Sequence, residues 1–420
     1  MTKLAVVGIG KLGLPIATYF ASKGATVVGV DIDASMVEQL TQGVSPIGEE
    51  PGVDENLADL VSSGSFRATT DVGDGVASAD VVIITVPLVT HGGEPDYRHL
   101  DAAVGSILHH LQEGALVVFE TTLPVGVTRQ RFLPELRKQV PSALVAFSPE
   151  RVSSGRIWRD LDTYPKLVGG VDAASTEAAV EFYRTHLDAE VWAMDSAEAA
   201  ELTKLAETTY RDINIAFANE LAIISDDLGV DVTAVIEAAN SQPYSHIHRP
   251  GIGVGGHCIP HYPHLLQLST VGSDLAMTSR RLNDAMPTRM VDVLRSEVGP
   301  LEGRTVVLLG VAYRPGVPET ASSPAFDFRD AAAQQGAVVL AVDPLFTETD
   351  LKEFGFSPWD GSPPDAFVLV TDHPEYKEFD FGGYPSTVVI DGRNALDAQQ
   401  VEAAGHRYRG TGRWQTKPVG

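Results

Sequence analysis

Residues Lys3-Leu-Ala-Val-Val-Gly8-Ile-Gly10-Lys-Leu-Gly13 place a short apolar run directly before three closely spaced glycines. Leu14 to Ser22 then carries apolar residues at helical spacing, and a second apolar run, Ala25 to Val30, ends at Asp31. A strand, a glycine turn, a helix and a second strand in this order predict a β-α-β unit of an α/β fold.

The three glycines have separate roles in a turn of this kind. Gly8 permits the tight turn, Gly10 lets the backbone approach a pyrophosphate, and Gly13 lets the helix pack closely on the strand. The positive end of the helix faces the bound anion. Asp31 can accept hydrogen bonds from both ribose hydroxyls and repels a 2′-phosphate, so the pattern predicts NAD binding rather than NADP binding. The alternative is an α/β turn that binds no ligand.

Further apolar runs predict that this unit extends into a parallel, doubly wound sheet. They lie at 81–86, 115–119 and 143–147, with helical or loop segments between them. Because strands and helices alternate through this region, we expect a first domain at residues 1–195.

A long helical segment follows this domain. No proline or glycine occurs from Ser196 to Leu228, where alanine, glutamate and leucine dominate. Asp195 or Ser196 can cap this helix, and Gly229 can end it. At about 1.5 Å per residue the helix would be roughly 50 Å long, which suits a link between domains or a dimer interface.

The remainder of the chain predicts a second, smaller α/β domain. A helical stretch runs from Leu282 to Val298, and apolar runs at 305–312, 338–342, 367–370 and 388–390 predict strands. We therefore expect an α/β protein with two doubly wound, Rossmann-like domains joined by a long central helix. The expected parts are an N-terminal domain at 1–195, a central helical part at 196–299 and a C-terminal domain at 300–420.

The C-terminal segment is locally basic. Arg407, Arg409, Arg413 and Lys417 follow His406 within a short stretch. We expect this segment to be a solvated terminus.

The composition excludes several classes of function. Lysine and arginine number 31 against 56 aspartates and glutamates, so the formal net charge is 31 − 56 = −25. A surface this acidic repels phosphate backbones and anionic lipid, so we expect neither nucleic acid nor a membrane as partner. A single cysteine and the lack of an apolar run of about 18 residues favour a cytoplasmic protein without disulfides or a membrane span. Glycines and Lys11 interrupt the first apolar run, so we expect a strand there rather than a signal peptide.

The single cysteine ends a glycine-rich run, Arg249-Pro-Gly251-Ile-Gly253-Val-Gly255-Gly256-His257-Cys258. Four glycines in six residues leave the backbone bare and allow close approach of a ligand. A positive potential from the adjacent His257 would favour the thiolate, so we expect Cys258 to be a nucleophile. The alternative is a buried structural cysteine. We expect His257 itself to be structural rather than catalytic.

Polar groups elsewhere in the chain are candidates for the same site. Lys204 and Thr208 share a face of the long helix because they lie four residues apart, although a lysine on such a helix is usually solvated. Glu120-Thr121-Thr122 and Ser148-Pro149-Glu150-Arg151 each follow a predicted strand, where strand ends border a ligand crevice. For each of these two motifs, a purely structural loop is an equal alternative.

Together these pieces resemble the nucleotide-sugar 6-dehydrogenases, the UDP-glucose/GDP-mannose dehydrogenase family. The likeness runs almost from end to end, in the same order and spacing. Besides the N-terminal glycines, its motifs are Thr85-Val86-Pro87, Glu120-Thr-Thr122, Ser148-Pro-Glu150-Arg-Val, Val168-Gly-Gly170, the run from Ala200 to Glu220, Gly251-x-Gly253-Val-Gly-Gly-His-Cys258, Gly310-Val-Ala-Tyr-Arg314-Pro and Val370-Thr-Asp372-His373. The His-Cys-Ile and Tyr-Arg-Asp-Ile-Asn sequences are most similar to the branch that oxidises UDP-N-acetylmannosamine or UDP-N-acetylglucosamine.

The resemblance implies a four-electron oxidation of a sugar C6 alcohol to a carboxylate with two NAD⁺. By this match Cys258 forms a thiohemiacetal and then a thioester, and Lys204 stabilises the oxyanion. The matched catalytic positions are Cys258, Lys204, Glu150, Thr122, Thr208 and Tyr262, of which Thr122 and Glu150 position or activate water. The matched NAD positions are Gly8, Gly10, Lys11, Leu12, Gly13, Asp31, Val86, Pro87 and Thr122. The matched nucleotide-sugar positions are Glu150, Arg151, Lys204, Arg249, Gly255 and Arg314.

The resemblance also implies how the larger parts work. The C-terminal domain binds the nucleotide diphosphate of the sugar, and the central helical part pairs subunits. We therefore expect a homodimer or a higher even oligomer. We expect no metal site.

Several substrate-facing positions depart from the family pattern. Thr208 replaces an asparagine, Tyr262 replaces an aspartate, and Tyr244 replaces an arginine that reaches a neighbouring subunit's sugar. Pro318 and Ala321 replace an aspartate and an arginine. These substitutions predict an altered substrate pocket.

Tyr262 is the departure with the largest chemical consequence. It cannot act as a carboxylate base, because the unperturbed pKa of a tyrosine is about 10. Loss of a positioned base typically costs about 10²- to 10⁴-fold in rate. Glu150 remains as a base, and His261 and His264 are further candidates, although loop histidines are more often bystanders.

Two other classes of function remain open. A redox-neutral epimerase or a two-electron oxidoreductase would keep the hydride-transfer groups and omit thioester hydrolysis, although neither needs Cys258. A nucleotide-binding regulator without turnover is the non-enzymatic alternative. The presence of Cys258, Lys204, Glu150 and Thr122 together argues against a regulator.

Overall fold

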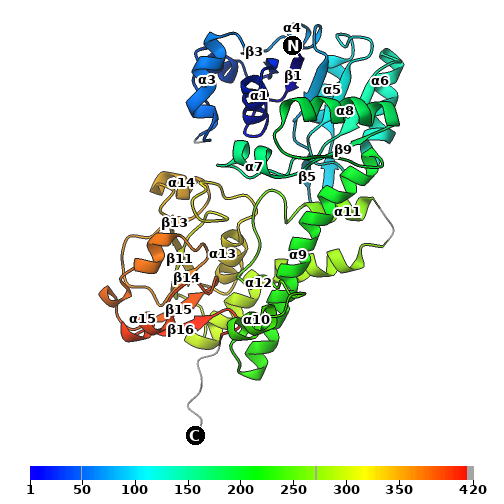
Figure 1. The fold of residues 1–420 in the computed structure, drawn as a ribbon. Coiled ribbons are helices and arrows are strands. Elements are labelled where there is room, and N and C mark those ends of the chain that lie inside the picture. Colours follow the sequence, from blue (N-terminus) through cyan, green and yellow to red (C-terminus); the bar gives the residue numbers. More distant parts are fainter. Residues whose placement is uncertain (49, 270–271, 414–420) are drawn as a thin grey trace. The chain divides into compact units, whose positions relative to one another are not determined.

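The computed structural model describes residues 1–48, 50–269 and 272–413 (Figure 1). The chain divides into two compact units, residues 1–207 with 264–271 and residues 208–263 with 272–420. Each unit is built on one large, mostly parallel sheet with helices on both faces. The fold class expected from the sequence is therefore confirmed.

The first unit holds an eight-stranded sheet in the order β10-β9-β8-β7-β4-β1-β2-β3. Its strands are β1 (Lys3–Val7), β2 (Thr26–Val30), β3 (Phe66–Thr69), β4 (Val81–Ile84), β7 (Leu116–Phe119), β8 (Leu144–Phe147), β9 (Lys166–Gly170) and β10 (Val191–Ala193). The apolar runs predicted β1, β2, β4, β7 and β8, whereas β3, β9 and β10 were not predicted.

One pair in this sheet contradicts the expectation of a parallel arrangement throughout. β8 and β9 are antiparallel, whereas β9 and β10 are again parallel. The segment between β8 and β9 carries only the short helix α7 (Ile157–Thr163), which packs against α1. Parallel neighbours usually need a longer crossover helix, so the chain returns here in the opposite direction.

Helices cover both faces of this sheet because alternate residues of a strand point to opposite sides. The helices and the hairpin of this unit are α1 (Gly13–Ser22), α2 (Ala34–Thr41), α3 (Val53–Ser62), α4 (Val72–Val76), the hairpin strands β5 (Val89–His91) and β6 (Glu94–Asp96), α5 (Arg98–Ile107), the π-helical turn η1 (Thr128–Phe132), α6 (Leu133–Gln139) and α8 (Ala173–His186). Leu4 and Val6 of β1 belong to one core with α1, α3, α7 and α8, whereas Ala5 and Val7 belong to the other with α4, α5 and α6.

The second unit holds a six-stranded parallel sheet in the order β13-β12-β11-β14-β15-β16. Its strands are β11 (Thr305–Leu309), β12 (Val338–Val342), β13 (Ser357–Pro358), β14 (Ala366–Leu369), β15 (Val388–Asp391) and β16 (Arg407–Gly410). One face packs against α12 (Asp274–Val298), α13 (Pro324–Gln334) and α14 (Glu348–Glu353), and the other against η2 (Pro374–Glu378), η3 (Phe381–Gly383) and α15 (Ala398–Ala403). β13 and β16 were not predicted, and α12 begins at Asp274 rather than at Leu282.

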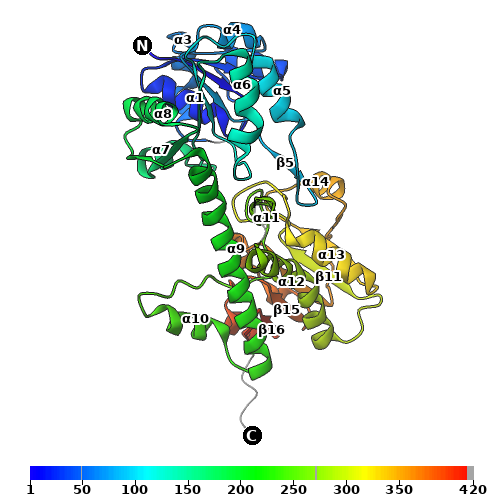
Figure 2. The ribbon, with the colours of Figure 1, turned by 90° about the vertical axis from the view of Figure 1, so that its right-hand side faces the viewer.

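The uninterrupted helix predicted after Ser196 is α9 (Ala197–Leu228), which begins in the first unit and ends in the second. Ser196 caps it, because its Oγ accepts the N–H of Ala199 at 3.1 Å, and Gly229 follows its last residue with a φ of +69°. Figure 2 shows α10 (Val232–Asn240) beside the C-terminal part of α9, where a small apolar cluster joins them. Across the described ranges, no helix combines the length and the hydropathy that crossing a membrane requires.

The expectation of a solvated basic terminus is wrong for the residues up to Arg413. Residues 407–410 form the edge strand β16, and Arg409 is buried, with its Nη2 2.8 Å from Asp226 of α9. The Nε of Arg413 lies 3.2 Å from Asp231. The positive charges are therefore neutralised by acidic partners on the helical part of the same unit. Lys417 lies outside the described residues.

Candidate active site

The glycine turn after β1 has the geometry that its sequence predicts. Gly8 has a φ of +92° and donates its N–H to the carbonyl oxygen of Val30 at 2.8 Å. A Cβ at Gly13 would lie 2.0 Å from the carbonyl oxygen of Gly8, so this position admits no side chain. A Cβ at Gly10 would meet no atom within 4 Å. Since Leu12 offers no side-chain cap to α1, the turn leaves room and backbone donors for a pyrophosphate.

Asp31 lies at the end of β2 with an oriented carboxylate. Its Oδ2 accepts the N–H of Ile9 at 2.9 Å, and its Oδ1 accepts the N–H of Asp33 at 3.1 Å. Each carboxylate oxygen has a second lone pair that a ribose hydroxyl can use. The neighbouring Ile32 is 93 % exposed and offers an apolar surface that suits the face of an adenine ring. Ile32 was not predicted, although an isoleucine between two aspartates is a signal that could have found it.

The motif around Thr85 borders the glycine turn. Thr85 Oγ1 donates to the carbonyl oxygen of Gly8 at 2.6 Å, which fixes the end of β4 against the turn. A Cβ at Gly8 would lie 2.9 Å from Val86 Cγ2, so the Val86 side chain packs directly against the turn. Pro87 and Lys11 are exposed beside it. These residues and the glycines form one continuous surface at the carboxyl ends of β1 and β4.

Thr122 lies half-buried in the loop that follows β7. Its neighbour Glu120 is buried, accepts a hydrogen bond from the hydroxyl of Tyr183, and pairs with the Nζ of Lys166 at 2.8 Å. Both carboxylate oxygens of Glu120 are therefore engaged with buried partners. Within the Glu120-Thr121-Thr122 motif, Glu120 anchors the loop.

A buried carboxylate on α9 holds the same loop from another side. Glu201 accepts the N–H of Gly126 at 2.5 Å, the N–H of Thr128 at 3.0 Å and the hydroxyl of Thr128 at 2.6 Å. Burial raises the pKa of the Glu201 carboxyl to about 7. Glu201 was not predicted, although an acidic residue three positions before Lys204 is visible in the sequence. It fixes the distance between α9 and the loop that carries Thr122.

Lys204 is buried, unlike an ordinary lysine on a long helix. Its Nζ donates to the carbonyl oxygen of Glu150 at 2.5 Å and lies 3.7 Å from the Oε2 of the same residue. Its Nζ also lies 3.8 Å from the Oε1 of Glu207 on the next turn of α9. The structure therefore brings together two residues that the sequence proposed separately, with an ammonium group beside a carboxylate.

Arg151 completes this charged group. Its Nε lies 3.0 Å from the Oε2 of Glu207, and its Nη1 donates to the carbonyl oxygen of Pro165 at 3.0 Å. Glu207 thus connects Arg151 with Lys204. Alternating positive and negative groups keep this site close to neutral in a strongly acidic protein.

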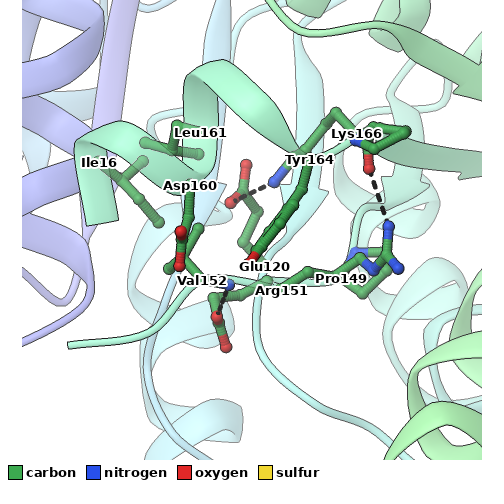
Figure 3. A pocket seen from close by; sticks show the side chains of 11 residues that line it. Ile16, Glu120, Pro149, Arg151, Val152, Asp160, Leu161, Tyr164 and Lys166 are labelled. Carbon is green, nitrogen blue, oxygen red and sulfur yellow. Dashed lines mark hydrogen bonds and ion pairs between the residues drawn. The ribbon is translucent and has the colours of Figure 1, made fainter. Parts of the chain in front are cut away.

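A pocket of about 340 Å³ lies under the segment from Pro149 to Lys166, within the first unit. Figure 3 shows the Glu120–Lys166 ion pair inside it, with Ile16, Leu161 and Tyr164 as apolar or aromatic lining. Glu150, Arg151 and Asp160 also line it. Lys166 was not predicted, because its partner lies 46 positions away in the sequence and nothing local marks the pair.

In the second unit, the glycines before Cys258 are packed against protein. A Cβ at Gly253 would lie 2.8 Å from Pro324, and one at Gly255 would lie 2.8 Å from Tyr313. Gly256 has a φ of +105°, donates its N–H to the carbonyl oxygen of Ala321 at 2.7 Å, and would place a Cβ 3.2 Å from the Tyr313 ring. The space that side chains would occupy at these glycines is therefore filled by protein, which explains why glycine stands there. The approach of their backbone to a ligand stays a prediction.

Cys258 is half-buried and forms no disulfide. Its carbonyl oxygen accepts the N–H groups of His261 and Tyr262 at 3.1 and 2.9 Å, which turns the chain after the cysteine. The adjacent His257 has a side chain that is 65 % exposed, and its Nε2 lies 2.6 Å from the Oε2 of Glu319. The Glu319 carboxylate thereby holds the imidazole ring of the residue that directly precedes the cysteine.

No group of three or more His, Cys, Asp or Glu side chains within the described part of the chain is arranged to hold a metal ion. The His261 Nε2 instead lies 3.1 Å from the hydroxyl of Ser322.

Three segments of the chain, in order, match the domains of one enzyme family. Residues 2–187 match its NAD binding domain, residues 198–285 its central domain and residues 307–398 its UDP binding domain. The chain belongs to the UDP-glucose/GDP-mannose dehydrogenase family.

Similar members of the UDP-glucose/GDP-mannose dehydrogenase family cover nearly the whole chain. A UDP-N-acetyl-D-mannosamine dehydrogenase of Pyrococcus horikoshii is 36 % identical over 428 residues, which cover 98 % of this chain and 99 % of that protein. An NDP-N-acetyl-D-galactosaminuronic acid dehydrogenase of Ralstonia nicotianae is 33 % identical over 418 residues, covering 95 % and 97 %. The solved structure of the UDP-D-ManNAc dehydrogenase of Pyrococcus horikoshii superposes with a TM-score of 0.87 at 34 % identity and covers 98 % of this chain and 99 % of that one.

Membership of the UDP-glucose/GDP-mannose dehydrogenase family makes this protein an NAD-dependent oxidoreductase that acts on a CH–OH group of a nucleotide sugar. The residues of the first unit fit the cofactor. The open space at Gly10 and the oriented carboxylate of Asp31 suit the pyrophosphate and the ribose of NAD.

The remaining residues predicted to contact the substrate lie in the second unit. Arg314 is half-buried, and its Nε donates to the hydroxyl of Tyr313 at 3.2 Å. Arg249 is exposed, and Tyr244 is 92 % exposed. Thr208 and Tyr262 are half-buried.

One cationic candidate in the second unit was not predicted. Arg393 follows β15, donates through its Nη1 to the carbonyl oxygen of Gly253 at 3.0 Å and through its Nε to that of Val370 at 2.6 Å. Burial lowers the pKa of its guanidinium group. An Asp-Gly-Arg sequence directly after an apolar strand is the signal that could have found it.

Proposed function

We propose that this protein oxidises the C6 alcohol of a UDP-linked sugar of the N-acetylhexosamine class to a carboxylate, in four electrons, through a thioester on Cys258. The observation that carries this proposal is the burial of Lys204 beside Glu150, because an ammonium group held out of water stabilises a developing oxyanion strongly. The names of the similar proteins support the sugar class. The altered residues of the pocket leave the individual sugar open.

The residues of the chain have separate roles in this proposal. Bound NAD⁺ supplies the oxidant, which accepts a hydride from the sugar carbon in each of two oxidations. The Cys258 thiolate adds to the aldehyde carbon and forms a C–S bond, so the aldehyde is held covalently between the oxidations. Lys204 stabilises the negative oxygen of the resulting adduct. Glu150 takes a proton from water, whose oxygen forms the new C–O bond as the C–S bond breaks and the thiolate leaves.

Thr208 and Tyr262 are proposed to slow the last of these steps. A threonine hydroxyl can replace only part of the hydrogen bonding of an asparagine amide. A tyrosine cannot replace an aspartate as a base near neutral pH. Glu150 then carries hydrolysis alone, and the thioester is expected to accumulate.

The stoichiometry of NADH tests the proposal directly. Two NADH per sugar consumed, with a carboxylate product, are expected. No net NADH with an inverted sugar would instead establish a redox-neutral epimerase, and one NADH with a released aldehyde would establish a two-electron oxidoreductase. Purified protein that binds nucleotide sugars but never reduces NAD⁺, across UDP-, GDP- and dTDP-sugars, would establish a regulator.

The Cys258→Ser variant separates these outcomes further. The four-electron route predicts that it loses acid formation by at least about 10³-fold, because the covalent step is gone. An epimerase predicts unchanged turnover. Hydroxylamine added during turnover of the unaltered protein should release a sugar hydroxamate from the thioester.

We propose three functional parts along the chain, with NAD binding in residues 1–195, subunit pairing in 196–299 and nucleotide-sugar binding in 300–420. The matched family domains at 2–187, 198–285 and 307–398 support this division. Arg314 and Arg393 are the cationic groups proposed to meet the diphosphate in the last part.

Subunit pairing is proposed to use one face of α9. Tyr210, Phe217 and Ile224 are spaced by seven residues, which places them on one stripe of the helix, and their exposed fractions are 57, 47 and 45 %. Leu228 continues the stripe and is 70 % exposed. An apolar stripe repeated on a second copy would bury itself in a symmetric pair.

Light scattering during gel filtration tests this dimer. The unaltered protein should elute at twice the chain mass or an even multiple of it. The Phe217→Glu variant should elute at half that mass. Val338→Glu changes another exposed apolar residue of the same unit and should elute at the mass of the unaltered protein.

A further inference from the structure

We infer that Asn219 is a positioning residue for the loop that carries Cys258, and that a buried hydrogen-bond chain between α9 and α12 holds Asn219 in place. The inference rests on the proposed role of Cys258. It concerns the placement of the thiol rather than the chemistry of the thiol itself.

Asn219 connects the cysteine loop to the helices. Its Oδ1 accepts the N–H of Gly251, the first glycine of the loop, at 2.8 Å, and its Nδ2 donates to the Oδ1 of Asn283 on α12 at 2.8 Å. Both asparagines are fully buried. An asparagine has one donor side and one acceptor side, so this arrangement fixes the orientation of the Asn219 amide.

The chain continues from Asn283 to a buried ion pair. Asn283 Nδ2 donates to the Oδ1 of Asp212 at 2.8 Å and to its carbonyl oxygen at 3.0 Å. Arg280 Nη1 donates to the same Oδ1 at 2.5 Å. Asp212 and Arg280 are 0 and 1 % exposed.

The three hydrogen bonds from Gly251 to Asp212 run in one direction. Gly251 donates to Asn219, Asn219 to Asn283 and Asn283 to Asp212, so each amide polarises the next and the chain ends on a carboxylate. Reversing any one amide would place two donors or two acceptors against each other. The position of the Gly251 amide is therefore coupled to a charge held inside the helix pair.

The arrangement is poor as a source of stability. Asp212 Oδ2, Arg280 Nη2 and Thr209 Oγ1 are buried without a hydrogen-bond partner. Burial raises the pKa of the Asp212 carboxyl to about 6 despite the neighbouring Arg280. Apolar residues would hold the two helices together at lower cost, because buried charges are expensive to desolvate. We infer that these polar groups lie there because they position the backbone of the loop before Cys258.

The geometric requirement is the position of the loop. Ile252 and Gly256 donate to the carbonyl oxygens of Gly392 and Ala321, so their amides anchor the loop to backbone of the C-terminal sheet region. Gly251 is anchored to a side chain instead, on the helical side. The loop is thereby fixed at both flanks, and Cys258 follows within seven residues of Gly251.

Alkylation of the thiol tests the inference without any substrate. The chain has one cysteine, so the rate of iodoacetamide modification reports on Cys258 alone. In Asn219→Asp, a carboxylate oxygen replaces the Nδ2 donor and repels the Oδ1 of Asn283. The other carboxylate oxygen can still accept the hydrogen bond from the N–H of Gly251. We expect the Asp variant to be alkylated at least about threefold faster. We also expect kcat to fall about 10²-fold with the KM for NAD unchanged, because small misplacements of a reacting group have effects of this size.

A second variant and a matched control keep the result interpretable. In Asn219→Ser, the shorter side chain can no longer accept the N–H of Gly251, and no new charge is buried. This variant should show the same faster alkylation, and it replaces Asn219→Asp in the test if the Asp variant does not fold. Asn240→Asp makes the same chemical change at an exposed asparagine that holds the backbone N–H of Ile247 at 2.8 Å, and it should alkylate as the unaltered protein does.

A double-mutant cycle identifies the chain itself. Asn283→Asp removes the next hydrogen bond, from Asn283 to Asp212. The double variant with Asn219→Asp should lose no more kcat than the worse single variant, because both substitutions disturb the same hydrogen-bond chain. Additive losses, or alkylation of Asn219→Asp and Asn219→Ser at the unaltered rate, would overturn the inference. Faster alkylation in a protein that oxidises no nucleotide sugar would leave the inference standing and refute the proposed function.

Discussion

The Nζ of Lys204 donates a 2.5 Å hydrogen bond to the carbonyl oxygen of Glu150, and the lysine side chain is only 8 % exposed. A lysine on a long helix usually extends into water, so this burial supports the role proposed for Lys204. The Oε2 of Glu150 lies 3.7 Å and the Oε1 of Glu207 lies 3.8 Å from the same Nζ, so two carboxylates fix the position of the ammonium group.

Replacing Lys204 by methionine should lower kcat by about 10²- to 10³-fold, because one fixed oxyanion-stabilising group is lost. Steady-state formation of NADH measures the effect, and NAD binding by fluorescence should stay unchanged. Lys23→Met is the matched control, since Lys23 lies in the same unit and pairs with Asp188 at the surface. Full activity of the Lys204 variant would remove it from the catalytic group.

Asp31→Asn should raise the KM for NAD by about 10- to 100-fold, because a hydrogen bond to a charged acceptor is replaced by one to a neutral amide. It should also reduce the preference for NAD over NADP, since the negative charge that repels a 2′-phosphate is gone. Asp33→Asn is the control, because Asp33 caps α2 through the N–H groups of Ser35 and Met36. If both variants change the KM for NAD equally, the assignment of Asp31 to the ribose fails.

Tyr262→Asp should speed the release of the acid product by about tenfold or more, because it introduces a carboxylate base at the position where the resemblance expects one. Rapid-quench measurement of the covalent intermediate gives the hydrolysis rate. Val338→Asp introduces a carboxylate at an exposed residue of the same unit that has no place in the proposed site, and it should leave that rate unaltered. A hydrolysis rate that does not change in Tyr262→Asp would show that Glu150 already carries this step without limitation.

Glu201 should make the protein less stable as the pH rises from about 4.5 to about 7. Burial raises the pKa of its carboxyl from 4.5 to about 7 in the folded state, so folding favours the protonated form. The free energy of unfolding should therefore fall by about 3 kcal/mol between those two pKa values, at about 1.36 kcal/mol per unit. Urea unfolding of Glu201→Gln from pH 5 to pH 8 should lack this decrease.

The neighbouring Glu198 gives the opposite sign and serves as the control for Glu201. The hydrogen bond from Arg129 lowers the pKa of the Glu198 carboxyl, so its contribution to stability is present at neutral pH and is lost on acidification. Glu198→Gln should therefore retain the decrease in stability between pH 5 and pH 8. A decrease that persists in Glu201→Gln would mean that another buried acid causes it.

The sequence predicted those turns and helices whose conformation depends on residues close to them in the chain. The turn at Gly8 depends on residues within a few positions of it, and the helix α9 depends on an uninterrupted run ended by Gly229. Asp31 was found because its place at the end of β2 is itself a sequence feature.

Long-range pairing explains what the sequence could not predict. Arg409 is buried because Asp226, distant in the sequence, neutralises it, and Lys166 is buried because Glu120 does. Likewise, the packing of Tyr313 and Pro324 against the glycines before Cys258 joins segments that are distant in the sequence. Burial of a charge, or coverage of a glycine, depends on partners whose identity only the folded chain supplies.

The close packing around Gly253, Gly255 and Gly256 limits how this enzyme can be redesigned. A Cβ would lie 2.8 Å from Pro324 at Gly253 and 2.8 Å from Tyr313 at Gly255, and Gly256 has a φ of +105° that other residues rarely adopt, so a substitution at any of the three would strain the loop. Attempts to broaden the range of accepted sugars should therefore leave the backbone before Cys258 untouched and vary side chains such as the half-buried Thr208 and Tyr262.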